Sequence, residues 1–237
     1  MLKKIIACIP NTITCMSLFF GCIAIVMSFH FYEEIGNLHA YQWAWICIGI
    51  AALCDFCDGA SARLLHAYSN LGKELDSLSD LVSFGVAPGM LVFNFMSLQP
   101  DTPLWMAFIA FLIPIMGELR LARFNIDDRQ TTSFLGMPIP ANAIFWIGYV
   151  ACMIKYGYVG AWPTAIIIVL MSLTMVMTSL KMFSLKFKNF KLMENLKRYI
   201  ILMAAIALVI IDGVAGFAWT ILFYLILSII PSSKSVA

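Results

Sequence analysis

Residues 55–80 read DFCDGASARLLHAYSNLGKELDSLSD, and this stretch places four aspartates between two long apolar runs. The whole chain has 237 residues, of which 62% are hydrophobic and 12% are charged. A soluble protein of this size carries about twice that charged fraction. Charged side chains next to hydrocarbon are costly, and they usually serve a function. The stretch therefore indicates a site at the edge of a membrane domain.

The apolar runs on both sides are long and continuous rather than alternating, which predicts helices. A transmembrane helix needs roughly 20 apolar residues. Eight spans are predicted, at 12–31, 41–62, 76–98, 103–124, 139–157, 160–180, 198–212 and 214–230. The last two are separated only around Asp212 and Gly213, which predicts a tight hairpin or a tilted pair. The predicted fold is an all-α integral membrane protein with about eight transmembrane helices.

The N-terminal segment MLKKIIACIPN carries two lysines and an apolar stretch. No small-residue cleavage site follows before the first span, so we expect it to remain in the mature protein. Residues 1–10 are predicted to form a short amphipathic helix at the membrane surface. The chain is then a single membrane domain over 1–237, with a core at 11–195 and a C-terminal helical pair at 196–237.

The positive charges indicate the orientation of the spans. If the N-terminus lies in the cytoplasm, all fifteen lysines and arginines except Lys155 fall on the cytoplasmic side. Such a bias is the usual signature of cytoplasmic loops. We therefore expect the aspartate stretch and both termini to face the cytoplasm, in a cell (inner) membrane. The seven cysteines are scattered through apolar segments, and the pair Cys54 and Cys57 has no second pair that would indicate a zinc site.

The spacing within the stretch predicts that its functional side chains face one another. One helical face about 140° wide, at the end of the second span, carries five of its residues: Asp55, Asp58, Gly59, Ala62 and Arg63. Gly72, Asp76 and Asp80 follow at i, i+4 and i+8, so they form one stripe that leads into the third span. Glu74 points away from that stripe. Four carboxylates are therefore expected to meet across a short loop.

Carboxylates so close together repel unless some are protonated or cations lie between them. Their oxygens are ligands for Mg²⁺, Mn²⁺ or Ca²⁺, and four of them suffice for two ions. Gly59, Ala62 and Gly72 allow close approach, and Arg63 can hold a phosphate with two hydrogen bonds. Together these features predict a phosphoryl-transfer site.

Two alternatives remain open at this point. The carboxylates could be solvated by lipid headgroups and paired with Arg63 and Lys73. The chain could also be a cation transporter, although such proteins often have charged residues near mid-span and inverted repeats, and the sequence shows no repeat.

The motif also carries a family resemblance. Its spacing resembles the signature of the CDP-alcohol phosphatidyltransferase family at every defined position: Asp55-x2-Asp58-Gly59-x2-Ala62-Arg63-x8-Gly72-x3-Asp76-x3-Asp80. The resemblance covers roughly residues 9–195. Four flanking segments resemble the integral-membrane phosphatidylserine synthase branch: IPNTIT at 9–14, SDLVSFGVAPG at 79–89, RLARFN at 120–125 and FLGMPIPA at 134–141.

The resemblance implies a CDP-alcohol phosphotransferase fold and assigns roles to the motif residues. The resemblance implies two divalent cations bound by four ligands: Asp55, Asp58, Asp76 and Asp80. The expected ions are Mg²⁺ or Mn²⁺, and Ca²⁺ is a further ion that could occupy the same sites. Asp80 is also expected to be the general base. The nucleotide and its phosphates are expected to contact a second group of residues: Gly59, Arg63, Ser69, Gly72, Asn11 and Thr14. The resemblance also implies a homodimer, and no nucleic acid is expected as a partner.

For this branch the implied reaction is transfer of the phosphatidyl group from CDP-diacylglycerol to L-serine, which gives phosphatidylserine and CMP. Glycerol 3-phosphate and inositol or inositol phosphate remain alternative acceptors, because the signature alone does not separate them. Arg120 and Arg123 are hypothesised to bind the serine carboxylate or the lipid phosphate, with membrane anchoring as the alternative. Lys186, in the segment SLKMFSLK, is a further candidate for substrate contact. Glu118 departs from the small or neutral residue expected in this branch.

Overall fold

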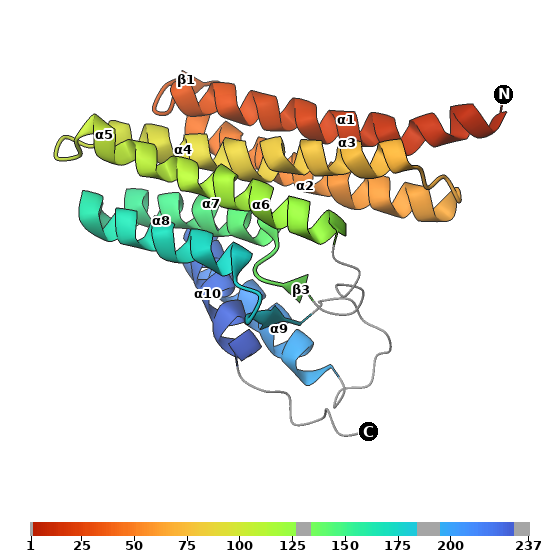
Figure 1. Ribbon diagram of the computed structural model, residues 1–237. Helices are drawn as coiled ribbons and strands as arrows, with labels where there is room; N and C mark the ends of the chain where they lie inside the picture. Colours follow the sequence, from red (N-terminus) through yellow and green to blue (C-terminus); the bar gives the residue numbers. More distant parts are fainter. Residues whose placement is uncertain (1, 127–133, 184–194, 230–237) are drawn as a thin grey trace.

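The computed structural model describes residues 2–126, 134–183 and 195–229, and these are almost entirely helical (Figure 1). The helices are α1 (Leu2–Phe29), α2 (Ala40–Leu64), α3 (Asn70–Asp80), α4 (Ala87–Ser97), α5 (Leu104–Ala107), α6 (Leu112–Ile126), α7 (Ile139–Tyr156), α8 (Ala161–Val176), α9 (Leu196–Asp212) and α10 (Gly216–Ile229). Three tighter or wider helical segments join some of them: the π-helical turn η1 (Leu81–Val86) and the 3₁₀ turns η2 (Phe108–Phe111) and η4 (Gly213–Ala215).

Six helical runs in the described residues are long and apolar enough to cross a membrane: Cys8–Phe29, Ala40–Leu64, Asn70–Ser97, Leu104–Ile126, Ile139–Tyr156 and Leu196–Ile229. Helix α8 is apolar but shorter, with 16 residues. The run at 196–229 contains both α9 and α10, which η4 joins. The chain is thus an all-α membrane protein, as predicted. The count of eight spans stays a prediction, because it requires α8 and both halves of the last run to cross separately.

The N-terminal segment differs from the expectation of a separate surface helix over 1–10. Helix α1 runs without interruption from Leu2 to Phe29, with Pro10 inside it. Proline removes one backbone hydrogen bond, but its fixed φ is itself compatible with a helix. The predicted surface helix and the first span are therefore one element.

The helices fall into two groups by direction (Figure 1). Helices α1, α2, α3, α4, α6, α7 and α8 extend along one common direction, whereas α9 and α10 are inclined to it. Helix α10 packs on both α7 and α9. The turn between α9 and α10 uses Gly213 at φ +62°, a conformation that favours glycine. The sequence correctly predicted a tight pair around Asp212 and Gly213.

The core lies between α2, α4, α6, α7, α8, α10 and η1, and its fully buried side chains include Trp146, Phe31, Phe84, Phe95 and Leu91. Large apolar side chains such as Phe19, Leu53 and Ile210 are instead exposed on the outer faces of α1, α2 and α9. Exposed apolar faces on helices are the pattern expected of surfaces that contact lipid, where a helix satisfies its own backbone.

Within the described residues, two short antiparallel strand pairs lie in the connections. Strand β1 (Glu34–Ile35) pairs with β2 (Leu38–His39) around a turn that begins at Gly36. Strand β3 (Phe134–Leu135) pairs with β4 (Lys181–Met182). This second pair brings the segment FLGMPIPA beside residues that follow α8, although the two are far apart in the sequence.

Serine hydroxyls connect the first three helices within the membrane region. Ser17 Oγ donates to the carbonyl of Ala51 at 3.0 Å, which joins α1 to α2. Ser79 Oγ donates to the carbonyl of Thr14 at 3.1 Å, and Ser83 Oγ donates to that of Ser17 at 3.0 Å. Helix α1 is therefore bonded to α2 on one side and to α3 and η1 on the other.

A second polar cluster joins α7 to the α9–α10 pair. Asp212 is 9% exposed and accepts hydrogen bonds from Lys155 Nζ at 2.6 Å, Tyr156 at 2.5 Å and Trp219 at 3.0 Å. Lys155 is the one cation that the orientation argument leaves outside the cytoplasm, and in the structure its charge is paired.

The contact between α7 and α10 gives a stability prediction. A Cβ at Gly148 would lie 2.2 Å from the backbone nitrogen of Ala218, so the helices must separate to accept any side chain. Gly148→Ala should destabilise the protein by about 1–3 kcal/mol, the usual cost of overpacking. Thermal unfolding in detergent measures this. The matched change Gly49→Ala places a Cβ where no atom lies within 4 Å. It should leave the unfolding temperature unchanged or raise it. Equal losses in both variants would contradict the prediction.

Candidate active site

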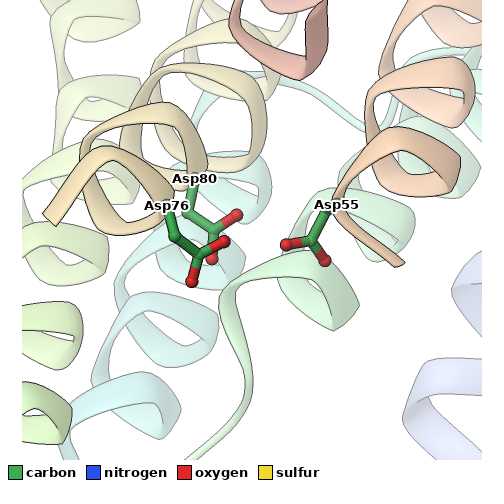
Figure 2. Close-up of side chains that lie close together, drawn as sticks. All are labelled: Asp55, Asp76 and Asp80. Carbon is green, nitrogen blue, oxygen red and sulfur yellow. The ribbon is translucent and has the colours of Figure 1, made fainter. Parts of the chain in front are cut away.

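Three of the four predicted aspartates meet in the structure. Asp55 lies on α2, and Asp76 and Asp80 lie one turn apart on α3. Figure 2 shows the Asp55 carboxylate directed toward those of Asp76 and Asp80. One carboxylate oxygen from each lies within 4.8 Å of the others, and all three residues are half-buried. The helical spacing correctly predicted that these side chains share one site.

The dimensions of this group fit a hard divalent cation. Opposite ligands of an octahedral Mg²⁺ are about 4.2 Å apart and those of Ca²⁺ about 5 Å apart, given the usual metal–oxygen distances. The three oxygens lie within 4.8 Å of one another, so the carboxylates are close enough together to be candidate ligands of one ion. Without a cation, three anions this close in a medium of reduced dielectric would repel one another strongly. The donor set and its spacing thus suit a metal centre.

Asp58 lies beside this group rather than within it. Its side chain is buried, with 6% exposure, and Thr14 Oγ1 donates a hydrogen bond to its Oδ2 at 2.5 Å. Helix α1 thereby fixes the orientation of a carboxylate on α2. The structure gives Thr14 a contact with a predicted metal ligand, whereas the sequence suggested only a place in the nucleotide pocket.

Three further predicted residues gather at the start of α3. The Ser69 hydroxyl caps the helix by accepting a hydrogen bond from the Gly72 amide at 2.9 Å. A Cβ at Gly72 would lie 3.0 Å from both Asn11 Oδ1 and Ser69 Oγ. Glycine at this position therefore allows α1 and α3 to approach closely, and it brings Asn11 into the same region as Ser69.

Gly59 and Arg63 lie one turn apart on α2, beyond the aspartates. Arg63 is exposed, and its Nη1 lies 3.6 Å from the position of a Cβ at Gly59. The guanidinium thus covers the glycine. Helix α2 ends at Leu64, and His66 has φ +49°, so His66 does not continue the helical face of the motif.

The two arginines of α6 have different surroundings. Arg120 is 7% exposed, interacts electrostatically with Asp80, and places its guanidinium 5.2 Å from the centre of the Phe124 ring. Among the described residues, no hydrogen-bond partner exists for Arg120 Nε. Arg123 is exposed, and its Nη1 donates to the carbonyl of Val176 at 2.9 Å, at the end of α8. Only Arg120 therefore lies next to the aspartates. Lys186 falls outside the described residues.

Asn125 is a residue that the sequence argument quoted without giving it a role. Its side-chain amide donates to Ser77 Oγ at 2.8 Å, and its backbone carbonyl accepts from Lys73 Nζ at 3.0 Å. These bonds join the end of α6 to α3 near the aspartates. The only signal in the sequence was its place in the segment RLARFN, beside the two arginines.

The π-helical turn η1 begins directly after Asp80. Such turns are rare and often occur at functional sites. Close contacts surround it, because a Cβ at Gly21 would lie 2.5 Å from Ser83 Oγ and one at Gly85 would lie 3.4 Å from the Pro114 backbone. Helices α1 and α6 therefore pack tightly against the turn that follows Asp80.

Comparison with known proteins identifies the family of this chain. Residues 7–176 match the family model described as CDP-alcohol phosphatidyltransferase. Three relatives named CDP-diacylglycerol–serine O-phosphatidyltransferase are similar to this chain. The Helicobacter pylori protein is 31% identical over 93% of this chain and 89% of its own length. The Bacillus subtilis protein is 40% identical over 56% of this chain and 69% of its own, and the Methanocaldococcus jannaschii protein is 34% identical over 66% of each. The resemblance inferred from the signature is confirmed: the chain belongs to the CDP-alcohol phosphatidyltransferase family.

Proposed function

We propose that this protein transfers the phosphatidyl group of CDP-diacylglycerol to the hydroxyl of L-serine, which gives phosphatidylserine and CMP. The observation that carries the proposal is the convergence of Asp55, Asp76 and Asp80 on one point, within the spacing that defines the family. The choice of serine is supported by the names of the relatives, which cover most of the chain.

The proposed chemistry is an in-line displacement at phosphorus. The serine hydroxyl attacks the lipid-side phosphorus, a new P–O bond forms, and the bond to the CMP oxygen breaks. Asp80 accepts the hydroxyl proton. A general base must lie within hydrogen-bond reach of the nucleophile, so this role requires the serine hydroxyl to bind next to Asp80. When bound to the aspartates, two divalent cations, Mg²⁺ or Mn²⁺, supply the positive charge that neutralises the diphosphate. Among the residues themselves, Thr14 holds the Asp58 carboxylate beside this site by a hydrogen bond.

The substrate contacts proposed for the remaining residues follow from their positions. Gly59 and Arg63 lie about one and two turns beyond Asp55 on α2, on the side where the nucleotide and its phosphates would meet water. Asn11, Ser69 and Gly72 lie together at the start of α3 and are proposed to line the same nucleotide pocket. Arg120 is the candidate for the serine carboxylate or the lipid phosphate, since it is buried beside Asp80 and has an unused donor.

The assay that tests the function measures CMP release by the purified protein. CDP-diacylglycerol and Mg²⁺ or Mn²⁺ are supplied, and L-serine, glycerol 3-phosphate and myo-inositol are offered separately. Release with serine alone is the expected result. Release with another alcohol would retain the chemistry and change the acceptor. No release with any of the three would contradict the proposed reaction and exclude the alternative acceptors offered as well; a cation transporter, the other interpretation of the sequence, is not supported by the family match.

The two α6 arginines give a prediction about the acceptor. Arg120→Gln should raise the KM for serine by about tenfold or more, because a charge-assisted contact is worth about 1.5–3 kcal/mol. Arg123→Gln should leave that KM unchanged and lower thermal stability slightly, since Arg123 bonds the end of α8. Steady-state kinetics with varied serine measures both. An unchanged KM in Arg120→Gln would exclude a direct contact with the serine carboxylate.

The proposed setting is a cell (inner) membrane with the aspartates and both termini on the cytoplasmic side. The distribution of lysine and arginine supports this orientation. Labelling of single introduced cysteines by an impermeant reagent tests it. The family resemblance supports a homodimer, and mass measurement of the detergent-solubilised protein tests that assembly.

A further inference from the structure

The segment FLGMPIPA places one fully buried side chain between two elements of the candidate site. Ile139 is the first residue of α7 and is 0% exposed. Its Cδ1 lies 2.6 Å from where a Cβ at Gly117 of α6 would be. The same atom lies 3.5 Å from where a Cβ at Gly85 of η1 would be. The end of Ile139 therefore fills a space that α6 and η1 leave open by having glycine at both positions.

Both glycines lie close to charged residues of the site. Gly117 precedes Arg120 by three residues on α6, and Gly85 follows Asp80 by five residues. Each separation is less than about 8 Å along the helix axis. Arg120 and Asp80 interact electrostatically. Ile139 thus packs between the two elements that carry this pair, close to the level of the pair itself.

The start of α7 is fixed from the side opposite Ile139. The backbone amide of Gly136 donates to the carbonyl of Leu180 at 2.8 Å. The amide of Met137 donates to the carbonyl of Thr174, in α8, at 3.0 Å. Gly136 has φ +78°, and a Cβ there would lie 2.2 Å from a backbone oxygen of α8, so the approach requires glycine. Because these contacts hold the segment against the end of α8, Ile139 cannot withdraw from the space between α6 and η1.

The fit of Ile139 against Gly117 leaves no room for a methyl group. Carbon atoms in contact lie about 3.5–4.0 Å apart, so a Cβ at Gly117 would require a movement of roughly 1 Å. Ile139 is β-branched and restricted at χ1, and it is buried on all sides, so α6 must share this movement. A displacement of α6 at Gly117 also displaces Arg120, one turn further along the same helix.

We propose that Ile139 is a positioning residue, which sets the separation of α6 from η1 and thereby places the Arg120 guanidinium beside Asp80 for the acceptor. Arg120 itself is 7% exposed, and its Nε has no hydrogen-bond partner among the described residues, so the group that it is placed to bind is a ligand. This inference rests on the proposed function, in which Arg120 binds the serine carboxylate. It gives the segment FLGMPIPA a part in acceptor binding without a contact to the acceptor.

A pair of variants tests the proposal by creating a clash and then removing it. Gly117→Ala should raise the KM for serine by about five- to tenfold, up to the increase expected when Arg120→Gln removes the contact completely. The KM for CDP-diacylglycerol should stay within about twofold of wild type. In Gly117→Ala/Ile139→Val the Cδ1 atom is absent, and the nearest remaining carbon of residue 139 lies 3.4 Å from the new methyl. This double variant should return the KM for serine to within about twofold of wild type.

Two controls separate positioning from a general loss of packing. Gly148→Ala creates a similar clash on α7, nine residues beyond Ile139, and should lower the unfolding temperature without changing the KM for serine. In an Arg120→Gln background, Gly117→Ala should cause no further increase, because the guanidinium is already absent. The proposal would be overturned by an unchanged KM for serine in Gly117→Ala, by an increase confined to the KM for CDP-diacylglycerol, or by an equal increase in the Arg120→Gln background.

A measurement without substrate separates failure of this inference from failure of the proposed function. The change in unfolding temperature caused by Arg120→Gln should depend on whether residue 80 is Asp or Asn, because the two side chains interact. This dependence should weaken in Gly117→Ala and return in Gly117→Ala/Ile139→Val. If it does so while the wild type releases no CMP with serine, the proposed function fails and the positioning role stands. A dependence of equal size in wild type and Gly117→Ala would overturn the positioning role, whatever the acceptor.

Discussion

Asp80→Asn is expected to lower kcat for CMP release by about 1,000-fold, and to do so without unfolding the protein. A general base alone contributes about 10²–10⁴ in rate. Asp80 also belongs to the group of three carboxylates that approach within 4.8 Å, so the substitution removes a metal ligand at the same time. Steady-state CMP release with saturating CDP-diacylglycerol and serine measures the effect.

Thermal unfolding provides the check on folding for this variant. In the absence of divalent cations, the neutral amide removes repulsion among the carboxylates, so Asp80→Asn should unfold at the same temperature as wild type or higher. Asp101→Asn, at an exposed position before α5, is the matched control and should keep wild-type activity. Retention of more than about a tenth of the activity in Asp80→Asn would exclude Asp80 as the base.

Removal of divalent cations is the second change expected to abolish activity. Chelation with EDTA should stop CMP release, and added Mg²⁺ or Mn²⁺ should restore it. Asp55→Asn should raise the Mg²⁺ concentration for half-maximal activity by about tenfold or more, which corresponds to about 1.4 kcal/mol of lost binding. Titration of the metal at fixed substrate concentrations measures this shift.

Glu74→Gln is the matched control for the metal titration. Glu74 lies on α3 between Ser69 and Asp76, but it is exposed and outside the group of three carboxylates. Its substitution removes one negative charge from the same helix and should leave the metal requirement unchanged. An equal shift in both variants would indicate a general effect of surface charge rather than coordination.

The sequence was sufficient to predict the main features of this site because they depend on local periodicity. Asp76 and Asp80 are four residues apart, so any helix through them must place both on one side. Asp55 could be added because a short loop joins α2 to α3. The same reasoning correctly left Glu74 outside the cluster.

Features that depend on contacts between distant segments could not be predicted in this way. Asp58 shares a helical face with Asp55, yet its hydrogen bond to Thr14 depends on how α1 packs against α2. Arg120 and Arg123 are three residues apart, but their different surroundings depend on the positions of Asp80 and the end of α8. Periodicity gives the direction of a side chain on its own helix and does not identify the helix that it meets.

Helix boundaries were predicted less accurately for a related reason. Residues 1–10 were predicted to be a separate surface helix, but α1 runs from Leu2 to Phe29 with Pro10 inside it. The π-helical turn after Asp80 also has no simple sequence signal, since Leu81–Val86 reads as an ordinary apolar segment. Tertiary packing around Gly21, Gly85 and Ser83 accompanies this wider turn.

The serine hydrogen bonds between α1, α2 and the α3–η1 run bear on how the molecule moves. Water does not compete for these donors inside the bilayer, so exchanging them for other partners is slow and costly. Helix α1 therefore links the two helices that carry the carboxylates, since its backbone and Ser17 bond both α2 and the α3–η1 run. The end of α6 is joined to the same unit, because Asn125 bonds both Lys73 and Ser77 of α3.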